Sequence, residues 1–250
     1  LPDDYLEIVE GCKDDPVLRT LILDYWNEVY TGPGTALILQ CLDEMVSLHK
    51  QLGDAFLSNF VEIGSMSGGS LWIYTKLFCK RGGSVICIEP IPRKDLIRVL
   101  NMLESDGYRI SYLQKFAEEC VDEVSKILTP SGIECLHLDG YHTTVDCLRQ
   151  WNLFVPLMSK DGIIIVHDAF LWQGPIFLRK FVERNKLRHK TFIGKLLIGQ
   201  IPQDTTGTTV VYPNGKKLPQ IGKSIRWYIF YWIEKFLIKP LRKISYRYRV

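Results

Sequence analysis

The cysteines of this chain form no short sequence motif. Its seven cysteines are odd in number and scattered, without any C-x-x-C pair, so neither a disulfide framework nor a zinc site is indicated. Internal repeats and low-complexity segments are also absent from the sequence. The apolar run at 227–233 is far shorter than the roughly 20 residues that span a bilayer, and the sequence as given opens without a basic and apolar leader. We therefore expect a globular protein of a reducing, cytoplasmic compartment.

What is present suffices for one sizeable core. The 250 residues are 46% hydrophobic and carry a net charge of +3, which suits a single domain without covalent cross-links. Helical spacing predicts two helices, at 16–30 and 35–52, ahead of the core. Five alternations of strand and helix then predict a parallel sheet covered on both faces, with strands at 59–63, 84–88, 109–113, 133–138 and 162–167 and helices at 69–80, 93–105, 117–128, 143–155 and 174–187. Two last strands, at 191–198 and 207–212, have no helix between them and are expected to form an antiparallel pair at the sheet edge.

A glycine-rich turn follows the first predicted strand. The run 61–70 reads as a buried strand that passes through Gly64 and Gly68 into a helix. Glycine lets the main chain approach a ligand that any Cβ would hold away. The spacing is G-x-x-x-G-G and not the G-x-G-x-x-G of dinucleotide folds, and Glu62 lies two residues before the first glycine. This pattern disfavours NAD and suits a ligand with positive charge.

The second predicted strand ends in Glu89, whose carboxylate could accept both hydroxyls of a ribose; a solvated acid at a strand end is the alternative. Together Glu62, Gly64, Gly68 and Glu89 resemble motifs one and two of the class I S-adenosylmethionine-dependent methyltransferases. The resemblance implies a Rossmann-like, doubly wound α/β fold, with a mostly parallel seven-stranded sheet and an antiparallel edge strand. It also implies S-adenosyl-L-methionine as the cofactor.

The same resemblance implies a set of cofactor contacts. The turn after the third strand lies beside the adenine in this fold, and Ser70 would contact the methionine part. The expected cofactor-binding residues are Glu62, Gly64, Ser65, Gly68, Ser70, Glu89, Phe116, Ala117, Glu118 and Asp139. An ordinary loop before a helix explains residues 114–118 nearly as well. We expect N-terminal helices packed on the core at 1–54, a cofactor-binding core at 55–215 and a basic, aromatic extension at 216–250.

Two further strand ends are unusually polar. The strand at 133–138 runs into Asp139-Gly-Tyr-His142, and the strand at 162–167 ends in His167-Asp168. Because the carboxyl ends of parallel strands meet at one edge of a sheet, we expect these side chains to lie close together. The D-G-x-H opening and the final H-D resemble a small class I family, over roughly residues 55–190. That family includes sugar O-methyltransferases of the macrocin O-methyltransferase and cephalosporin hydroxylase type.

Many members of that family bind a divalent cation, which implies Mg²⁺ or Mn²⁺ at Asp139, Asp168 and His167. Hard oxygen ligands suit such an ion, which would bind and acidify the acceptor hydroxyl. A cation-independent enzyme is the alternative, because His167 stands where relatives have a second acid. Asp139 and Asp168 could also be ordinary residues at helix entries.

Transfer of a methyl group to a hydroxyl requires a base near the oxygen. A histidine with an ordinary pKa of about 6.5 suits this role near neutrality, and a positioned base is worth about 10²- to 10⁴-fold in rate. His142 is the first choice for the base and His167 the second, with Asp139 as the third catalytic residue. We expect His137 in the core and His49 at the surface.

The last 28 residues differ from the rest of the chain in charge. Residues 223–250 carry eight Lys or Arg and one Glu, interleaved with Trp and Tyr. This composition suits an anionic membrane interface, so we expect a membrane surface as a partner and a peripheral location. Packing against the body or in a homo-oligomer is the alternative, and fusion to further domains is compatible with the sequence. Nucleic acid is disfavoured because the rest of the chain is net acidic.

We therefore expect an S-adenosylmethionine-dependent O-methyltransferase that acts on a sugar hydroxyl of a glycan, a glycolipid or a nucleotide-sugar related compound. The sugar is implied by the family resemblance and by the tail. O-methylation of a small phenolic or polyketide metabolite is the rival reaction. A non-catalytic nucleotide-binding or membrane-interface module is the rival from another class.

Overall fold

A computed structural model describes residues 14–29, 42–53, 57–195, 205–213 and 216–221. The basic, aromatic tail at 223–250 and the breaks between the two N-terminal helices and between the last two strands lie outside these residues. No helix within the described ranges is both long and apolar enough to cross a membrane.

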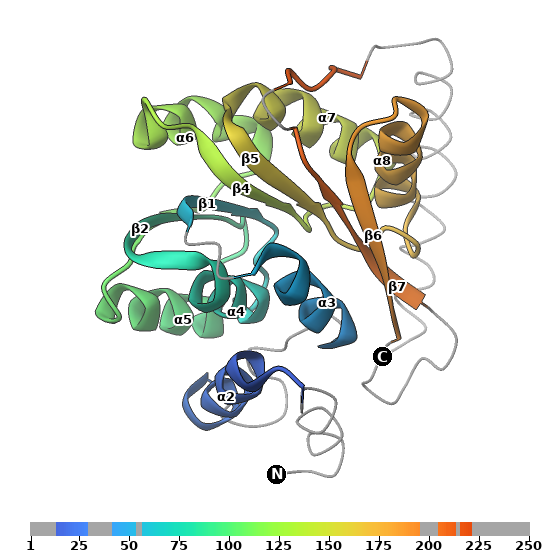
Figure 1. The fold of residues 1–250 in the computed structure, drawn as a ribbon. Helices are drawn as coiled ribbons and strands as arrows, with labels where there is room; N and C mark the ends of the chain where they lie inside the picture. The colour runs from blue at the N-terminus through green and yellow to red at the C-terminus, as the bar shows by residue number, and fades with distance from the viewer. Residues whose placement is uncertain (1–13, 30–41, 54–56, 196–204, 214–215, 222–250) are drawn as a thin grey trace, which may run out of the picture.

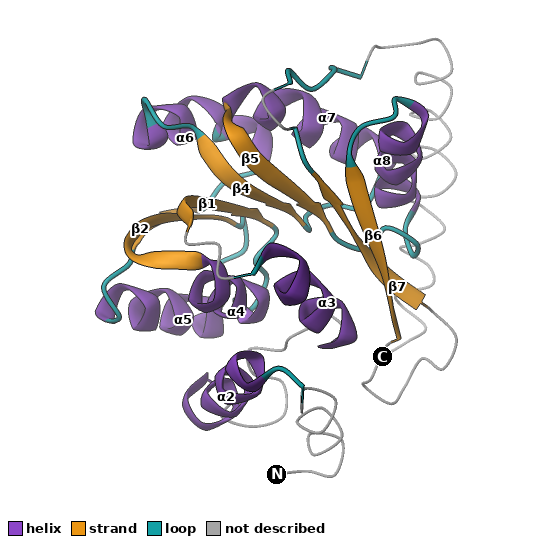
Figure 2. Ribbon diagram, viewed as in Figure 1, coloured by secondary structure: helices purple, strands orange, loops and turns teal. Residues whose placement is uncertain are grey.

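The centre of the molecule is one seven-stranded sheet (Figures 1 and 2). The strands are β1 (Leu57–Ile63), β2 (Cys79–Ile88), β3 (Arg109–Leu113), β4 (Ile133–Leu138), β5 (Met158–Val166), β6 (His189–Lys195) and β7 (Thr205–Val211). Their order in the sheet is β3-β2-β1-β4-β5-β7-β6. The first five strands pair in parallel, and β7 runs antiparallel to both β5 and β6. The predicted antiparallel pair is confirmed, with β6 as the edge strand and β7 inserted beside β5.

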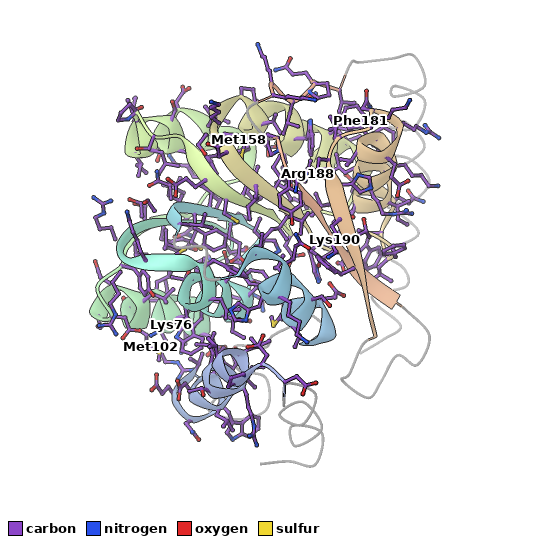
Figure 3. All side chains as sticks on the ribbon, in the orientation of Figure 1. Lys76, Met102, Met158, Phe181, Arg188 and Lys190 are labelled. Carbon is purple, nitrogen blue, oxygen red and sulfur yellow. The ribbon has the colours of Figure 1, made fainter. Side chains whose placement is uncertain are left out.

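Helices cover both faces of this sheet (Figure 2). They are α2 (Pro16–Asp24), α3 (Leu42–Leu52), α4 (Gly69–Phe78), α5 (Lys94–Ser105), α6 (Val121–Leu128), α7 (Thr144–Phe154) and α8 (Gln173–Arg184), with short turns η1 (Tyr25–Val29), η2 (Ala117–Glu119) and η3 (Val155–Leu157). Alternate residues of each strand point to opposite faces. Phe60 and Cys135 therefore join the core under α2 to α5, while Val61 and Leu136 join the core under α6 to α8. Side chains fill both layers between sheet and helices (Figure 3).

The helices form where apolar residues recur at helical spacing. In α5 the buried residues are Leu96, Val99, Leu100 and Leu103, which make one apolar stripe facing the core. Strands β3 and β4 begin and end at the predicted residues, whereas β2 begins at Cys79 instead of residue 84. The reason is a tertiary contact, because Cys79 pairs with Leu57 at the start of β1.

The N-terminal helices pack on the face that carries α4. Tyr25 of η1 meets the ring of Trp72 edge-on, with ring centroids 5.4 Å apart. His49 of α3 is buried, and its Nδ1 lies 2.7 Å from Oδ2 of Asp15. The prediction of a surface position for His49 is therefore wrong, because the partner that buries it lies 34 residues away in the chain.

Candidate active site

A cavity of about 250 Å³ opens at the carboxyl ends of β1, β2 and β4. This is the edge at which an open parallel sheet forms its binding crevice. The sequence-predicted residues that line it are Gly64, Glu89, Phe116, Ala117, Glu118, Asp139 and His142. The other predicted residues lie beneath or beside this cavity and do not line it: Glu62, Ser65, Gly68, Ser70, His167 and Asp168.

The glycine turn brings bare main chain to the cavity. Gly64 adopts a φ of +90°, and its N–H donates to the carbonyl oxygen of Ile88 at 2.9 Å. A Cβ on Gly64 would lie 2.3 Å from the carbonyl oxygen of Asp139, so a side chain there would collide with the end of β4. Gly68, with a φ of +87°, is the N-cap of α4. Only glycine adopts these conformations without cost.

Ser65 and Ser70 are buried beside this turn and away from the cavity. The Ser65 hydroxyl accepts a hydrogen bond from the Cys87 thiol, with Sγ and Oγ 3.2 Å apart. Ser70 lies in the first turn of α4 and is 6% exposed. Both residues therefore support the turn in this structure, and a direct contact with the cofactor stays a prediction.

Glu89 fixes the rim of the cavity. Its Oε2 accepts from the Met66 N–H at 3.0 Å and its Oε1 from the Ile91 N–H at 3.0 Å. The carboxylate is 8% exposed, so it is a buried anion satisfied by main-chain donors on both sides. A carboxylate has about four acceptor positions, which leaves room for ligand hydroxyls on the cavity side.

Glu62 lies under the glycine turn and is fully buried. Its Oε1 is 2.7 Å from Nδ1 of His137 on the neighbouring strand β4. The ring of Tyr74 in α4 meets His137 edge-on, with centroids 4.9 Å apart. The expectation that His137 belongs to the core is confirmed. The structure does not bring Glu62 to the cavity, and its observed partner is His137.

Aromatic and aliphatic side chains form an exposed rim around the cavity. Phe116 and Tyr141 stack with centroids 6.0 Å apart and an interplanar angle of 29°. They are 43% and 53% exposed, and Ile91 beside them is 55% exposed. Large apolar residues in such positions mark a binding surface more often than a structural one.

The two polar strand ends converge, as predicted. Nε2 of His142 lies 3.1 Å from Oδ2 of Asp168 and 3.5 Å from Oδ1 of Asp139. Nδ1 of His167 lies 3.1 Å from Oδ1 of Asp139 and 3.4 Å from Oδ1 of Asp168. Asp168 holds a φ of +55°, a strained conformation for a residue with a Cβ. Such strain is typical of functional positions.

The close charges shift the pKa of each group. Burial alone would raise the pKa of the Asp139 carboxyl, but His167 and His142 hold that pKa well below its usual range. Burial alone would lower the pKa of both imidazoles, but the neighbouring carboxylates raise it to about 9 for His142 and about 10 for His167. Both rings are therefore mostly protonated at neutral pH in the ligand-free protein.

One group in the described part of the chain could hold a metal ion. It comprises Asp139, His142 and Asp168, whose ligand atoms all lie within 4.8 Å of one another. Two carboxylates and one imidazole fit a divalent cation such as Mn²⁺, provided that His142 gives up its proton. The predicted set named His167 in place of His142. In the structure His167 Nδ1 is directed at Asp139 and its Nε2 faces Glu44 of α3, 3.9 Å away.

Sequence reasoning missed several residues around this site. Gln150 of α7 lines the cavity. Trp172 stacks on the ring of His142, with centroids 5.7 Å apart and an interplanar angle of 20°. Trp172 follows the predicted site residue Asp168 by four residues, so its closeness in sequence could have identified it as a neighbour of the site. Gln150 lies in the helix that follows His142 and Glu44 lies in α3 ahead of the first motif, and no local pattern points to either residue.

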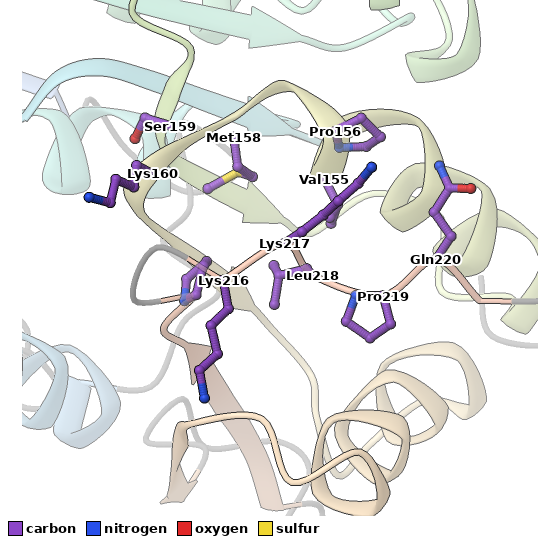
Figure 4. A pocket seen from close by; sticks show the side chains of 11 residues that line it. Val155, Pro156, Met158, Ser159, Lys160, Lys216, Lys217, Leu218, Pro219 and Gln220 are labelled. Carbon is purple, nitrogen blue, oxygen red and sulfur yellow. The ribbon is translucent and has the colours of Figure 1, made fainter.

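A second cavity, of about 780 Å³, lies elsewhere on the molecule (Figure 4). It is lined by the amino end of β5, including Met158 and Lys160, and by the segment 216–220. That segment packs on α7, where Trp151 Nε1 donates to the carbonyl oxygen of Pro219 at 3.0 Å. The side chains of Lys160, Lys216 and Lys217 point in different directions (Figure 4). This cavity therefore lacks the convergent polar groups of the first.

Residues 61–169 match a family model described as a methyltransferase domain. The protein R132 of Acanthamoeba polyphaga mimivirus is 25% identical over 114 residues, which cover 44% of this chain and 50% of that protein. The match thus spans about half the length of this curated relative.

Solved structures share the fold at low sequence identity. An O-methyltransferase from Bacillus cereus in complex with SAH is 12% identical, with a TM-score of 0.53 over 82% of this chain and 90% of that one. The precorrin-6y C5,15-methyltransferase of Geobacter metallireducens is 13% identical, with a TM-score of 0.52 over 74% of this chain and 94% of that one. The matched segment runs from β1 to the residues just after β5 and contains both the glycine turn and the converging strand ends. Residues 61–169 of this chain are thus similar to a methyltransferase domain, and the sheet that contains them has the Rossmann-like fold of the solved methyltransferase structures.

Proposed function

We propose that this protein transfers a methyl group from S-adenosylmethionine to a hydroxyl oxygen of a small-molecule acceptor. One observation carries the proposal: a single cavity is lined both by the glycine turn with Glu89 and by Asp139 with His142. The glycine turn and Glu89 offer bare main chain and a carboxylate, which suit a nucleoside. Asp139 and His142 offer acid and base groups within reach of that nucleoside. The match to a methyltransferase domain supports this reading.

The apolar rim supports the nucleoside half of the proposal. Ile91, Phe116 and Tyr141 present flat or aliphatic surfaces at the mouth of the cavity, and Glu89 lies at its side. A purine would bury its faces against such a rim, while its ribose hydroxyls would donate to the carboxylate. S-adenosylmethionine supplies an electrophilic methyl group on a positively charged sulfur when it is bound.

The chemistry assigned to this chain is positioning and proton removal. As the acceptor oxygen forms its bond to the methyl carbon, the carbon–sulfur bond breaks and the hydroxyl proton must leave. Neutral His142 would accept that proton at Nε2, and Asp139 and Asp168 would stabilise the imidazolium that results. Most of the remaining rate gain would come from holding the acceptor about 3 to 3.5 Å from the methyl carbon.

The proposal includes the binding of a divalent cation, Mg²⁺ or Mn²⁺, at the candidate active site. Asp139, His142 and Asp168 would hold it. Bound there, it would acidify the acceptor hydroxyl. Its binding would also require His142 to lose its proton, so a His142 that held the cation would not serve as the base.

A sugar is the proposed acceptor, on the strength of the resemblance to sugar O-methyltransferases. The exposed ring of Tyr141 and the partly buried ring of Trp172 beside His142 suit the apolar face of a sugar ring. The same two aromatic rings favour a phenolic acceptor, which is the second candidate. If residues 223–250 bind a membrane surface, as we propose, a glycolipid acceptor is favoured among the sugars. That role involves no residue of the candidate active site.

The test has two parts. Isothermal titration of the purified protein with SAH, the demethylated product, is expected to show one site, and Gly64→Ala is expected to lower the affinity of that site. Transfer of a labelled methyl group to a panel of sugars and phenols is expected to identify the acceptor class. Binding of SAH with no transfer to any acceptor would favour the non-catalytic nucleotide-binding module. Absence of SAH binding would overturn the proposal.

A further inference from the structure

Gln150 is a buried glutamine on the core side of helix α7. It is 5% exposed, and its neighbours on the helix, Cys147, Trp151 and Phe154, are buried as well. Glutamine is seldom found in such a stripe, because its amide carries two N–H donors and a carbonyl acceptor that need partners once water is excluded. In the part of the chain that the structure describes, no group forms a hydrogen bond with this amide. A buried polar group of this kind calls for an explanation.

The side chain of Gln150 lies on the buried side of the candidate active-site cavity. Gln150 lines this cavity, so the small surface that it retains faces the cavity space. A Cβ on Gly140 would lie 2.9 Å from Nε2 of Gln150 and 3.6 Å from its Cδ, so the amide packs against bare main chain at the end of β4. Gly140 immediately precedes Tyr141, whose ring stacks on Phe116. The amide is therefore next to the aromatic rim, on its buried side.

The amide of Gln150 differs in charge from the acids that line the same cavity. Glu89 accepts from main-chain N–H groups on both sides, and Asp139 contacts His167. Glu118 accepts from Arg149 at 2.8 Å, and these two side chains are 40% and 43% exposed, so that ion pair lies toward solvent. The amide is neutral and offers a donor and an acceptor side by side. Such a group fits the edge of a neutral heterocycle better than it fits a carboxylate, an amine or a sulfonium.

We infer that Gln150 recognises the adenine base of the methyl donor through its 6-amino edge. The inference rests on the proposed function, because it takes S-adenosylmethionine as the ligand of the cavity. The carbonyl oxygen of the amide accepts from the 6-amino group, and the amide N–H donates to a neighbouring ring nitrogen. Glutamine pairs with adenine in this two-bonded manner in nucleic-acid recognition. Gln150 then selects a 6-aminopurine, while Glu89 holds the ribose and the rim covers the faces of the base.

Three variants separate the amide from the bulk of the side chain. Gln150→Met removes the amide and keeps an unbranched side chain of similar length, which suits the buried stripe of α7. Gln150→Glu keeps an oxygen that accepts from the 6-amino group. The matched control is Gln51→Met, because Gln51 is a partly buried glutamine of α3 that accepts from Nζ of Lys190 at 2.6 Å and does not line the cavity. Thermal unfolding establishes that each variant is folded.

The experiment compares two ligands by calorimetric titration of the purified protein. One is SAH, and the other is the SAH analogue that carries hydrogen in place of the 6-amino group of the purine. We expect the wild type to bind SAH roughly 10- to 100-fold more tightly than the analogue. Gln150→Met is expected to bind the two ligands with nearly equal affinity, because the group that accepts from the amino group is gone. Gln150→Glu and Gln51→Met are expected to keep the preference for SAH.

The ratio of the two affinities decides the role of Gln150. A folded Gln150→Met that prefers SAH as strongly as the wild type would overturn the inference, and so would a wild type that binds both ligands equally. Loss of the preference in Gln51→Met as well would also overturn it, because the effect would then not come from the cavity. A wild type that binds neither ligand would instead refute the proposed function. Binding of SAH without any dependence of the preference on Gln150 would refute the inference alone.

Discussion

Gly64 and Asp139 touch through their main chains. A Cβ on Gly64 would come within 2.3 Å of the carbonyl oxygen of Asp139 and 2.5 Å of the Cα of Gly140. The contact joins the end of β1 to the end of β4, which pair in parallel. It thereby fixes the distance between the turn proposed to hold the nucleoside and the carboxylate proposed to serve the reaction.

Gly64→Ala is expected to break this contact. A left-handed conformation costs an alanine about 1–2 kcal/mol, and the collision with Asp139 adds to that cost. The displaced turn is expected to lower the affinity for SAH by roughly 100-fold, which corresponds to about 2.7 kcal/mol of binding free energy. The matched control is Gly107→Ala, because Gly107 has a φ of +91° and no atom within 4 Å of an added Cβ. Urea unfolding and calorimetric titration of both variants measure the difference. Equal effects of the two substitutions would contradict the role given to the contact.

Glu89→Gln is expected to weaken SAH binding without unfolding the protein. Hydrogen bonds to a charged acceptor are worth about 1.5–3 kcal/mol, so the affinity should fall by roughly 10- to 100-fold. The control is Glu123→Gln, which removes an exposed acid that pairs with Lys115 and does not line the cavity. Calorimetric titration with SAH compares the two. An affinity for Glu89→Gln equal to that of the wild type would mean that the carboxylate only holds Met66 and Ile91.

His142→Gln is expected to lower the rate of methyl transfer by about 10²- to 10⁴-fold, the usual worth of a positioned base. The fold should persist, because the His142 side chain is 28% exposed. His189→Gln serves as the control, since His189 does not line the cavity and its Nδ1 lies 2.8 Å from the carbonyl oxygen of the nearby Leu187. Initial rates with a labelled methyl donor give the comparison. Transfer at the wild-type rate in His142→Gln would remove His142 from the mechanism.

The rate of transfer should depend on pH through His142. Carboxylates at Asp139 and Asp168 raise the pKa of this imidazole to about 9, so the neutral form needed for a base increases from pH 7 to about pH 9. The rate should rise over that range in the absence of a divalent cation. The contribution of the ion pairs between His142 and these carboxylates to the free energy of unfolding has the opposite trend with pH. It is complete below the ordinary histidine pKa of about 6.5. It is lost as the pH rises through about 9, where the folded protein releases the proton of His142.

Asp139→Asn tests that assignment, because it removes one of the two carboxylates that raise the pKa of His142. The midpoint of the pH profile should move to lower pH in this variant. Rate profiles of the wild type and Asp139→Asn, recorded with chelator present, provide the measurement. A wild-type rate that is constant or falls between pH 7 and pH 9 would exclude His142 as the base.

A divalent cation is expected to bind at Asp139, His142 and Asp168 with release of a proton. Asp168→Asn should weaken binding of Mn²⁺, and so should a lower pH, because the imidazole must be neutral to act as a ligand. Electron paramagnetic resonance of free Mn²⁺ measures the affinity. The control is Asp106→Asn, an acid that pairs with Lys76 at a distance from the site. An unchanged rate of methyl transfer after exhaustive removal of metal would show that cation binding is not required for catalysis.

The local sequence determined the elements of this fold and the edge of the sheet at which the site lies. The sequence pattern predicted β3 and β4 to the residue, although β4 is buried along most of its length and β3 buries only Leu113. The glycine spacing and the acids at strand ends placed Gly64, Glu89, Asp139 and His142 together. This worked because carboxyl ends of parallel strands must converge, whichever helices connect them.

Only the tertiary structure decided which partner each polar group takes. Glu62 reads as a ligand contact in sequence, yet its oxygen meets His137 across two strands. His167 reads as a cation ligand, yet it turns toward Asp139 and Glu44. Partners separated by 75 or 164 residues, as in Glu62 with His137 and Glu44 with Thr208, leave no local pattern. The direction of a buried polar side chain is set by the nearest group that can satisfy it, and that group is known only once the chain has folded.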